Sequence, residues 1–309
     1  MSSQLLRQVG IVSESKAVPP DQVARIAAAI QKQVQRDFAP VWSISATVAA
    51  FARLEDVPLG TWPILIQDDI GYYAAGIHQD HDGQPFALVE SSTEDGVVSL
   101  TTSHECLEML ADPFGKHLVP GDSPKPDQNR VVFLVEVCDP SEAASYAYTV
   151  DGELVSDFYT PSFFEPVAAP GVRYSFTGAI QEPRSVLQGG YLSWMVPETR
   201  DWWQEIWFGT PQSTFKKLGP IDDSSRALRT ELDRVTGPDR ANAIKPGRSA
   251  ALLGGSRLKR VSIATGARAH DLRTRIEEIH AEAKLTRVDG DGPARPNPAD
   301  THRRSAPRI

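Results

Sequence analysis

The sequence predicts an α+β fold, and three observations support that class. Two segments, residues 21–37 and 97–111, repeat apolar residues at helical spacing. Short runs rich in β-branched and aromatic residues lie between and after them, as in strands. The composition then changes near Gly219, and the 309 residues exceed the usual length of one domain, about 100 to 200 residues. We therefore expect one α+β domain over residues 1–215 and a mostly helical extension over residues 216–309.

The first predicted elements are a helix and two strands. Residues 21–37 follow two prolines and begin with Asp21, a typical N-cap, and their apolar residues share one helical face. Two strand-like runs follow at residues 42–50 and 62–67, and a turn that contains proline and glycine separates them. These three segments predict a helix that packs on the strands that follow it.

A hairpin or edge strand, a second helix and a further strand come next. The turn signal Asp82-Gly83 precedes an apolar run, which predicts a hairpin or an edge strand over residues 86–90. Residues 97–111 predict a helix that ends before a proline, because the residue that precedes proline disfavours helical backbone. Residues 130–140 predict a strand that ends at its own proline.

The extension differs from the domain in charge as well as in composition. Residues 1–215 contain 12 basic and 28 acidic residues, a net charge of -16, whereas residues 216–309 contain 20 basic and 12 acidic residues, a net charge of +8. Helical stretches are predicted near residues 222–236 and 267–284. From about residue 287 the apolar content is too low to offset the entropy of ordering, so we expect disorder there.

Charge and composition exclude several classes of function. An acidic domain argues against nucleic-acid binding, which needs clustered Lys and Arg, but it suits cations. The basic extension could contact an acidic protein partner. No apolar stretch approaches the roughly 18 residues of a membrane helix, and the start of the chain lacks an export signal, so we expect a cytoplasmic protein without a membrane span. Two cysteines, Cys106 and Cys138, are too few for a disulfide framework or an all-cysteine zinc site.

The most informative segment is Ser103-His104-Glu105-Cys106-Leu107-Glu108, followed by Asp112-Pro113. At 100° per residue, Glu108, Asp112 and Glu105 lie about 40°, 80° and 100° from His104 on the helix. The opposite face is apolar and is expected to pack on a sheet. Carboxylates crowded on one face repel each other, and this helix contains no Lys or Arg. A bound divalent cation would reverse the sign of that interaction.

The spacing of His104 and Glu108 suits a single metal ion held from adjacent helical turns. The segment is a variant of the His-Glu-x-x-His helix of zinc peptidases, in which Glu108 stands where the second histidine would be. The alternative is a solvated acidic helix face that includes a histidine by chance. Metal binding is the preferred interpretation, because a chain of this composition is expected to contain the pattern by chance only about 0.02 times. Glu105, displaced from the other two, would then face a water on the metal.

At this point the chain resembles the zincin metallopeptidases over about residues 20–140, with a helix, strands that end in an edge strand, and then the metal helix. It also resembles poorly characterised bacterial proteins that share a Ser-His-Glu-x-x-Glu-x-x-x-Asp-Pro helix. The resemblance implies a mixed sheet packed on a metal-binding helix. It implies that His104 and Glu108 are ligands and that Glu105 is the general base. A carboxylate at Glu108 makes the metal a weaker Lewis acid than a second imidazole would.

The remaining site residues are predicted less directly. On the strand expected over residues 131–138, Glu136 shares a face with Cys138, and its distance along the chain matches the downstream Glu of one zincin subgroup, so Glu136 is the preferred third ligand. Asp112 is next, although it also suits the end of the helix, and Asp139 and Cys138 follow. Tyr159 is a candidate for stabilising an oxyanion.

One further feature and two functions follow from the same residues. His78 and His81 flank an acidic turn. An exposed hairpin is the preferred interpretation of this turn, and a second cation site is the alternative.

The leading hypothesis is a zinc-dependent hydrolase of peptide bonds, in which Glu105 activates a metal-bound water. The alternative is a catalytically inactive binding or assembly module that the metal stabilises. Another divalent cation is also compatible, including Ca²⁺, because carboxylate-rich sites suit it.

Overall fold

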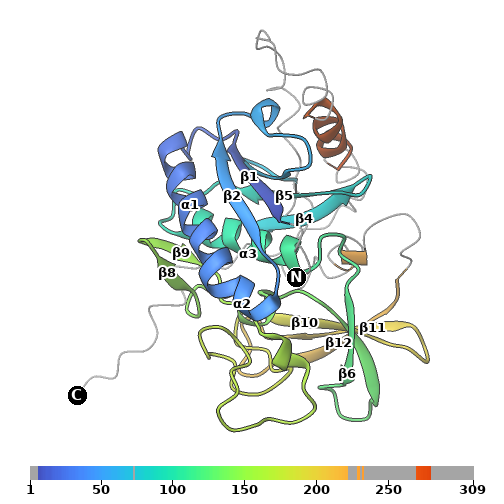
Figure 1. The fold of residues 1–309 in the computed structure, drawn as a ribbon. Helices are drawn as coiled ribbons and strands as arrows, with labels where there is room; N and C mark the ends of the chain where they lie inside the picture. The colour runs from blue at the N-terminus through green and yellow to red at the C-terminus, as the bar shows by residue number, and fades with distance from the viewer. Residues whose placement is uncertain (1–5, 72–73, 222–227, 230–231, 233–268, 280–309) are drawn as a thin grey trace.

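The computed structural model describes residues 6–71, 74–221, 228–229, 232 and 269–279, and within them it contains two five-stranded sheets (Figure 1). The helices are α1 Pro20–Gln33, α2 Ala39–Trp42 and α3 Val97–Ala111, with a π-helical turn at Val34–Phe38. The strands are β1 Arg7–Ser13, β2 Ala46–Phe51, β3 Trp62–Gln67, β4 Gly76–His81, β5 Gln84–Glu90, β6 Leu118–Asp122, β7 Arg130–Leu134, β8 Tyr148–Val150, β9 Glu153–Val155, β10 Tyr191–Val196, β11 Asp201–Ile206 and β12 Thr214–Pro220. Short 3₁₀ turns lie at Leu54–Asp56, Asp139–Ser141 and Pro161–Phe164.

The first sheet, called the mixed sheet, has the strand order β2-β1-β3-β5-β4. Its first four strands run parallel, and β4 pairs antiparallel with β5 through the predicted Asp82-Gly83 turn. Parallel strands are joined by crossovers, and the crossover from β1 to β2 contains α1. Buried residues on neighbouring positions of these strands alternate between the two faces, so both faces of the sheet need a cover.

One face of the mixed sheet packs on α1 and α3. Ile64 and Ile66 of β3 belong to the same apolar cluster as Ile26 and Ile30 of α1 and Leu107 of α3. The predicted first helix is confirmed, since its apolar stripe is buried and the helix continues through the π-helical turn to residue 38. The helix predicted over residues 97–111 is confirmed as α3 at the same boundaries.

The other face of the mixed sheet packs on a helix at residues 269–279. Leu272 and Ile276 of this helix form a second apolar cluster with Leu65 and Leu88. Figure 1 shows the helix beside the sheet, in red. A helix was predicted near residues 267–284, and its described part is confirmed. The division of the chain near residue 215 stays a prediction, but this part of the extension contributes to a core.

The second sheet, called the antiparallel sheet, has the order β12-β11-β10-β7-β6. Its centre is the hairpin β10–β11, in which Trp194 pairs with Trp203. Aromatic residues are enriched in strands, and β10 and β11 contain Tyr191, Trp194, Trp202 and Trp203. Leu228 and Leu232, in the predicted 222–236 stretch, pack against Trp202 of this sheet, and the described residues there are helical.

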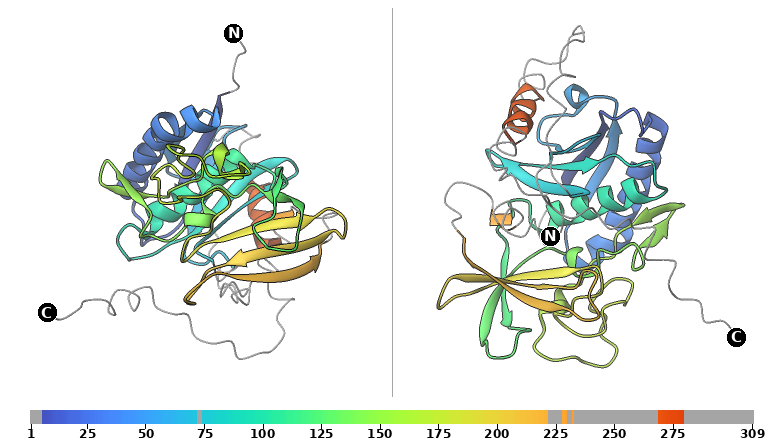
Figure 2. Two further views of the ribbon diagram at one scale, coloured as in Figure 1. Left: turned by 90° about the horizontal axis from the view of Figure 1, so that it is seen from below. Right: turned by 180° about the vertical axis from the view of Figure 1, so that it is seen from behind.

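Helix α3 lies between the two sheets (Figure 2). Thirteen of its 15 residues are buried, so its acidic face is covered as well as its apolar face. The cover on the acidic side is the segment after β7, which crosses the helix and includes Asp139. Thr101 and Thr102 donate hydrogen bonds to backbone carbonyls four residues earlier, which makes buried hydroxyls tolerable inside the helix.

The structure corrects four details of the predicted strands. The strand predicted over residues 42–50 begins only at Ala46, because residues 39–42 form helix α2. β1 was not predicted, because its apolar run is only four residues long and includes Gly10, a residue type depleted in strands. The edge strand is β4, and residues 86–90 lie inside the sheet between β3 and β4. The strand predicted over residues 131–138 ends at Leu134, where its pairing with β6 stops, and the Cys138 amide further along donates to the Glu108 carboxylate.

Some predictions fall on parts of the chain outside the described residues. These are the disordered tail from about residue 287 and the rest of the helical stretches near residues 222–236 and 267–284. No helix in the described part of the chain is long and apolar enough to cross a membrane.

Candidate metal centre

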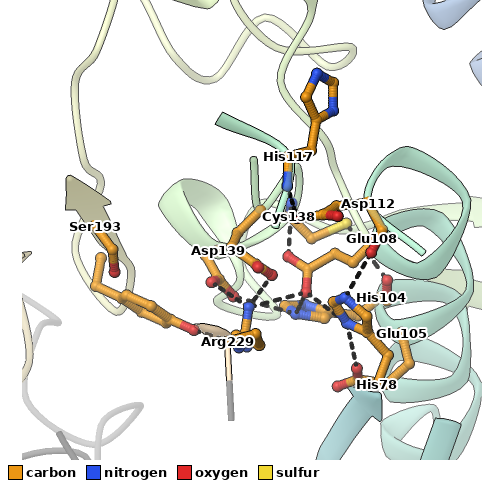
Figure 3. Close-up of polar contacts among 12 residues, drawn as sticks. His78, His104, Glu105, Glu108, Asp112, His117, Cys138, Asp139, Ser193 and Arg229 are labelled. Carbon is orange, nitrogen blue, oxygen red and sulfur yellow. Dashed lines mark hydrogen bonds and ion pairs between the residues drawn. The ribbon is translucent and has the colours of Figure 1, made fainter. Parts of the chain in front are cut away.

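Helix α3 and the 3₁₀ turn after β7 bring three potential ligands together. His104 and Glu108 are one helical turn apart, and His104 Nε2 lies 3.3 Å from Glu108 Oε2. The same nitrogen lies 3.3 Å from Asp139 Oδ1. Figure 3 shows the three side chains converging. Glu108 and Asp139 are fully buried, and the side chain of His104 is 11% exposed.

These two separations match two edges of a metal coordination sphere. His104 and Glu108 form a close group of ligand atoms with Cys138, and Glu108 and Asp139 form one with Glu136, with all atoms of each group within 4.8 Å of one another. In a tetrahedral site with metal–ligand distances of about 2.0 to 2.1 Å, two ligand atoms lie about 3.3 Å apart. Glu108 Oε2 and Asp139 Oδ1 are both buried, and neither has a hydrogen-bond partner within the described residues. Buried carboxylate oxygens are rarely left unpaired, because the desolvation of a charged group is costly. The residues present therefore fit a divalent cation.

The second oxygen of Glu108 has a fixed role. The Cys138 backbone N–H donates to Glu108 Oε1 at 3.2 Å, which orients the carboxylate and leaves Oε2 facing His104. A hydrogen bond to the free oxygen of a ligating carboxylate is a common feature of metal sites. The Cys138 thiol is buried near the His104 carbonyl, and burial raises its pKa well above the usual value, so it packs as a small neutral side chain.

A guanidinium from the predicted extension occupies the same cluster. Arg229 Nη1 lies 3.5 Å from Glu108 Oε2 and 3.2 Å from Asp139 Oδ2, and it also bonds Glu136. Arg229 Nη2 donates to the Tyr191 hydroxyl at 3.0 Å. Leu228, next to it, is anchored in the core of the antiparallel sheet. Nothing in the local sequence around residue 229 distinguishes it from other arginines of the extension, so sequence reasoning missed it.

The cluster contains more buried carboxylates than positively charged side chains, and this imbalance shifts the pKa values of its members. Burial would lower the pKa of His104, but the Glu108 and Asp139 carboxylates outweigh burial and raise it well above the usual value. Burial and the Glu108 charge raise the pKa of Asp139 well above its usual range. Burial would raise the pKa of Glu108, but His104 and Arg229 hold it far below the usual value. His104 and Asp139 therefore retain protons, which a metal would displace.

On the other side of Glu108 the structure places Glu105 and His78. Glu105 Oε2 lies 3.6 Å from Nδ1 of His78, a residue of strand β4. His78 is fully buried, so the prediction of an exposed hairpin is wrong for this residue. The imidazole of His81, at the end of the same strand, is 20% exposed and lies 3.2 Å from Asp271 Oδ2.

The other predicted residues are placed as follows. Glu136 lies in the cluster, where it pairs with Arg229 and can share a cation with Glu108 and Asp139. The Asp112 carboxylate accepts the backbone N–H groups of Lys116 and His117, so it ends α3 and is in none of the groups that could hold a metal among the described residues. Asp139 was predicted as a ligand only after Glu136 and Asp112, but its Oδ1 lies 3.3 Å from His104 Nε2.

Tyr159 is buried beside this cluster. Its ring stacks on Phe163 with centroids 4.3 Å apart, and its hydroxyl has no hydrogen-bond partner within the described chain. Burial first, and then the charges of Glu108 and Asp139, raise the pKa of Tyr159 well above its usual value. The phenol therefore stays protonated at neutral pH and can act as a hydrogen-bond donor.

Comparison with protein-family models, with curated proteins and with solved structures found no match. The roles of the clustered side chains are therefore inferred from their geometry and chemistry.

Proposed function

We propose that this chain is a metal-dependent hydrolase that binds zinc through His104, Glu108 and Asp139. The observation that carries the proposal is the pair of 3.3 Å separations between His104 Nε2 and two buried carboxylate oxygens without hydrogen-bond partners. Buried charges need a partner of opposite sign. With His104 and Asp139 protonated, His104 and Arg229 supply two positive charges for three buried carboxylates, those of Glu105, Glu108 and Glu136.

The order of elements supports the resemblance to zincins. After α1 the chain forms the parallel strands β2 and β3, the antiparallel edge strand β4, the internal parallel strand β5 and then α3. Peptide-bond hydrolysis is therefore the reaction we propose. A bound divalent cation supplies Lewis acidity and lowers the pKa of water.

The chain's own residues supply the remaining chemistry. Glu105, one residue after the ligand His104, has an oxygen without a hydrogen-bond partner in the described chain, so it can accept a proton. The protonated Tyr159 phenol can donate to an oxygen that becomes negatively charged. Glu136 stays on Arg229 and holds that guanidinium next to the ligands.

One observation favours the alternative, a binding or assembly module in which the metal serves structure. The ligand cluster is almost closed to solvent, and closed sites are typical of structural zinc. One histidine with several carboxylates also suits Ca²⁺, which prefers oxygen ligands.

A pair of conservative variants separates the two functions. Glu105→Gln keeps size but removes the base, so the protein should keep its metal and cleave casein about 10² to 10⁴ times more slowly. Glu108→Gln should weaken metal binding, because an amide oxygen is a poorer ligand than a carboxylate. Metal content and casein cleavage are measured on both. If the wild-type protein cleaves nothing with any metal, the binding module is the better account. If Glu105→Gln loses metal and Glu108→Gln keeps it, the assigned roles are reversed.

A further inference from the structure

A second group of buried ligand atoms lies on the opposite side of Glu108 from His104. His78 Nδ1 is 3.6 Å from Glu105 Oε2 and 3.7 Å from Glu108 Oε2. The side chains of His78 and Glu108 are fully buried, and that of Glu105 is 3% exposed. Two elements of structure thus meet here: the edge strand β4 and helix α3, which contributes two carboxylates.

The hydrogen bonding of His78 decides which atom it presents to this group. His78 Nε2 lies 3.2 Å from the backbone carbonyl of Asp112, which can only accept a hydrogen bond. The proton of the neutral ring is therefore on Nε2, and Nδ1 directs a lone pair at the two carboxylates. Metal-binding histidines commonly anchor their other ring nitrogen on a carbonyl in this way.

The three facing atoms are all acceptors in this state. Nδ1 of His78, Oε2 of Glu105 and Oε2 of Glu108 are buried, and none has a hydrogen-bond partner within the described residues. The separations of 3.6 and 3.7 Å exceed a normal hydrogen bond, so a proton on Nδ1 would not satisfy either carboxylate. A cation placed among the three atoms would satisfy all of them.

We propose that His78, Glu105 and Glu108 form a second divalent-cation site that shares Glu108 with the first. The effect of this site on activity rests on the hydrolase proposed above. Glu105 is the base in that reaction and a ligand in the second site, and one carboxylate cannot do both at once. With one ion bound per chain, Glu105 is free to act as the base. With a second ion bound, Glu105 is a ligand, so the second ion inhibits hydrolysis.

The second site is weaker than the first. It has to share Glu108 with an ion that is already bound, and the charge of that ion repels the next one. Zinc above one equivalent per chain should therefore suppress activity, while the first equivalent restores activity to chelated protein.

The test is a zinc titration of chelated, full-length protein, with bound zinc counted by elemental analysis after each step. Wild-type protein should bind two equivalents. His78→Asn keeps a polar side chain next to the Asp112 carbonyl, and it should bind one, with at least about a 10-fold loss of affinity for the second. His104→Ala should keep the His78 equivalent, and Glu108→Gln should weaken both.

His81→Ala is the matched control. It lies on the same strand and belongs to a separate surface group with Asp82 and Asp271. It should bind two equivalents and keep the inhibition at excess zinc. If His81→Ala loses the second equivalent and His78→Asn retains it, the second ion lies at the surface and the proposal is overturned.

A measurement on the wild-type protein covers the case in which His78→Asn does not fold, as judged by circular dichroism. Two Co²⁺ ions that share a carboxylate are magnetically coupled, so the second equivalent should reduce the paramagnetic resonance signal of the first. A signal that doubles would place the ions apart and overturn the proposal.

The outcomes also separate this proposal from the function on which it rests. If the wild-type protein binds two equivalents of zinc, His78→Asn loses the second, and neither cleaves casein, the second site is supported and the hydrolase proposal fails. One equivalent in wild type, with hydrolysis intact, would overturn the second site and leave the hydrolase.

Discussion

At the scale of single residues, Arg229 is the most unusual member of the site. Its guanidinium contacts three carboxylates, and two of them are the proposed ligands Glu108 and Asp139. The guanidinium shares Glu108 Oε2 with the proposed metal, whereas it contacts Asp139 through Oδ2 and not through the proposed ligand atom Oδ1. Arg229 therefore stabilises the metal-free protein and competes with the metal.

Arg229→Gln removes this competing charge. The affinity for zinc should rise about 10-fold, equivalent to about 1.4 kcal/mol, as measured by competition with a chelator. The metal-free variant should unfold at a lower temperature, because buried carboxylates lose their partner. The control is Arg273→Gln, which breaks pairs with Glu14 and Glu55 and should leave zinc affinity unchanged. A fall in zinc affinity in Arg229→Gln would show that Arg229 supports the ligands instead.

The protonation of His104 and Asp139 sets the pH dependence of stability. A group with a raised pKa in the folded state contributes stability below its unfolded pKa, about 6.5 for His104, and loses it as pH rises through the folded pKa. Asp139 has the same sign. The lowered pKa of Glu108 stabilises the folded protein above its usual pKa of 4.5, and this contribution is lost only at more acidic pH.

Chelated protein should therefore lose stability as the pH rises above about 6.5, the unfolded pKa of His104. Zinc replaces the protons, so zinc affinity should rise over the same range. Thermal unfolding with chelator and with zinc, at several pH values, measures both trends. If the stability of the chelated protein rises with pH instead, the proposed protonation of His104 and Asp139 is contradicted.

Sequence reasoning found the residues that one helix brings together. His104, Glu105 and Glu108 follow from the helical period alone, because their positions on α3 depend only on local geometry. Asp139, His78 and Arg229 come from other elements, and their approach depends on how strands cross the helix. Those three contacts could not be derived from spacing.

At the scale of elements, the close approach of β4 to α3 positions Glu105. A Cβ at Gly76 would lie 2.5 Å from Glu105 Oε1 and 2.8 Å from Thr101 Cγ2. Gly76 has no positive φ, so its role is space and not backbone conformation. A glycine at this position of the edge strand lets the carboxylate lie against the backbone.

Gly76→Ala should displace Glu105 and leave the ligands in place. Casein cleavage should fall at least about 10-fold at unchanged metal content, and overpacking should cost about 1 to 3 kcal/mol of stability. The control is Ile77→Val, the next residue on β4, which packs in the cluster on the opposite face of the sheet. It should cost about 0.5 to 1.5 kcal/mol and keep the rate. If Gly76→Ala cleaves casein at the wild-type rate, Glu105 does not take part in the reaction.

The strength of each local pattern explains which elements were predictable. Helices α1 and α3 have clear ends, and the β4–β5 hairpin has an Asp-Gly turn, so local signals suffice. Strand β7 was predicted too long because its apolar run continues to Val137, whereas its pairing with β6 stops at Leu134. Strand β10 pairs with β7 across a long connection, which no local signal predicts, and β11 and β12 extend the sheet from β10.

At the scale of the whole molecule, the site lies where two sheets meet α3. The mixed sheet contributes His78, α3 contributes His104 and Glu108, and the segment after β7 contributes Asp139. Arg229 and the helix at residues 269–279 connect described parts of the extension to this body. The excess of acidic residues in the first 215 positions includes all four carboxylates of the cluster, so part of the charge asymmetry has a local cause.

The central claim is that the chain holds a metal ion through α3. The most direct measurement is elemental analysis of protein purified without chelator and without an affinity metal. We expect about one tightly bound transition metal per chain, lost in His104→Ala and retained in His117→Ala, whose ring lies at the end of α3 next to the Ala111 carbonyl. Absence of metal at neutral pH, together with no thermal shift on addition of Zn²⁺, would contradict the claim.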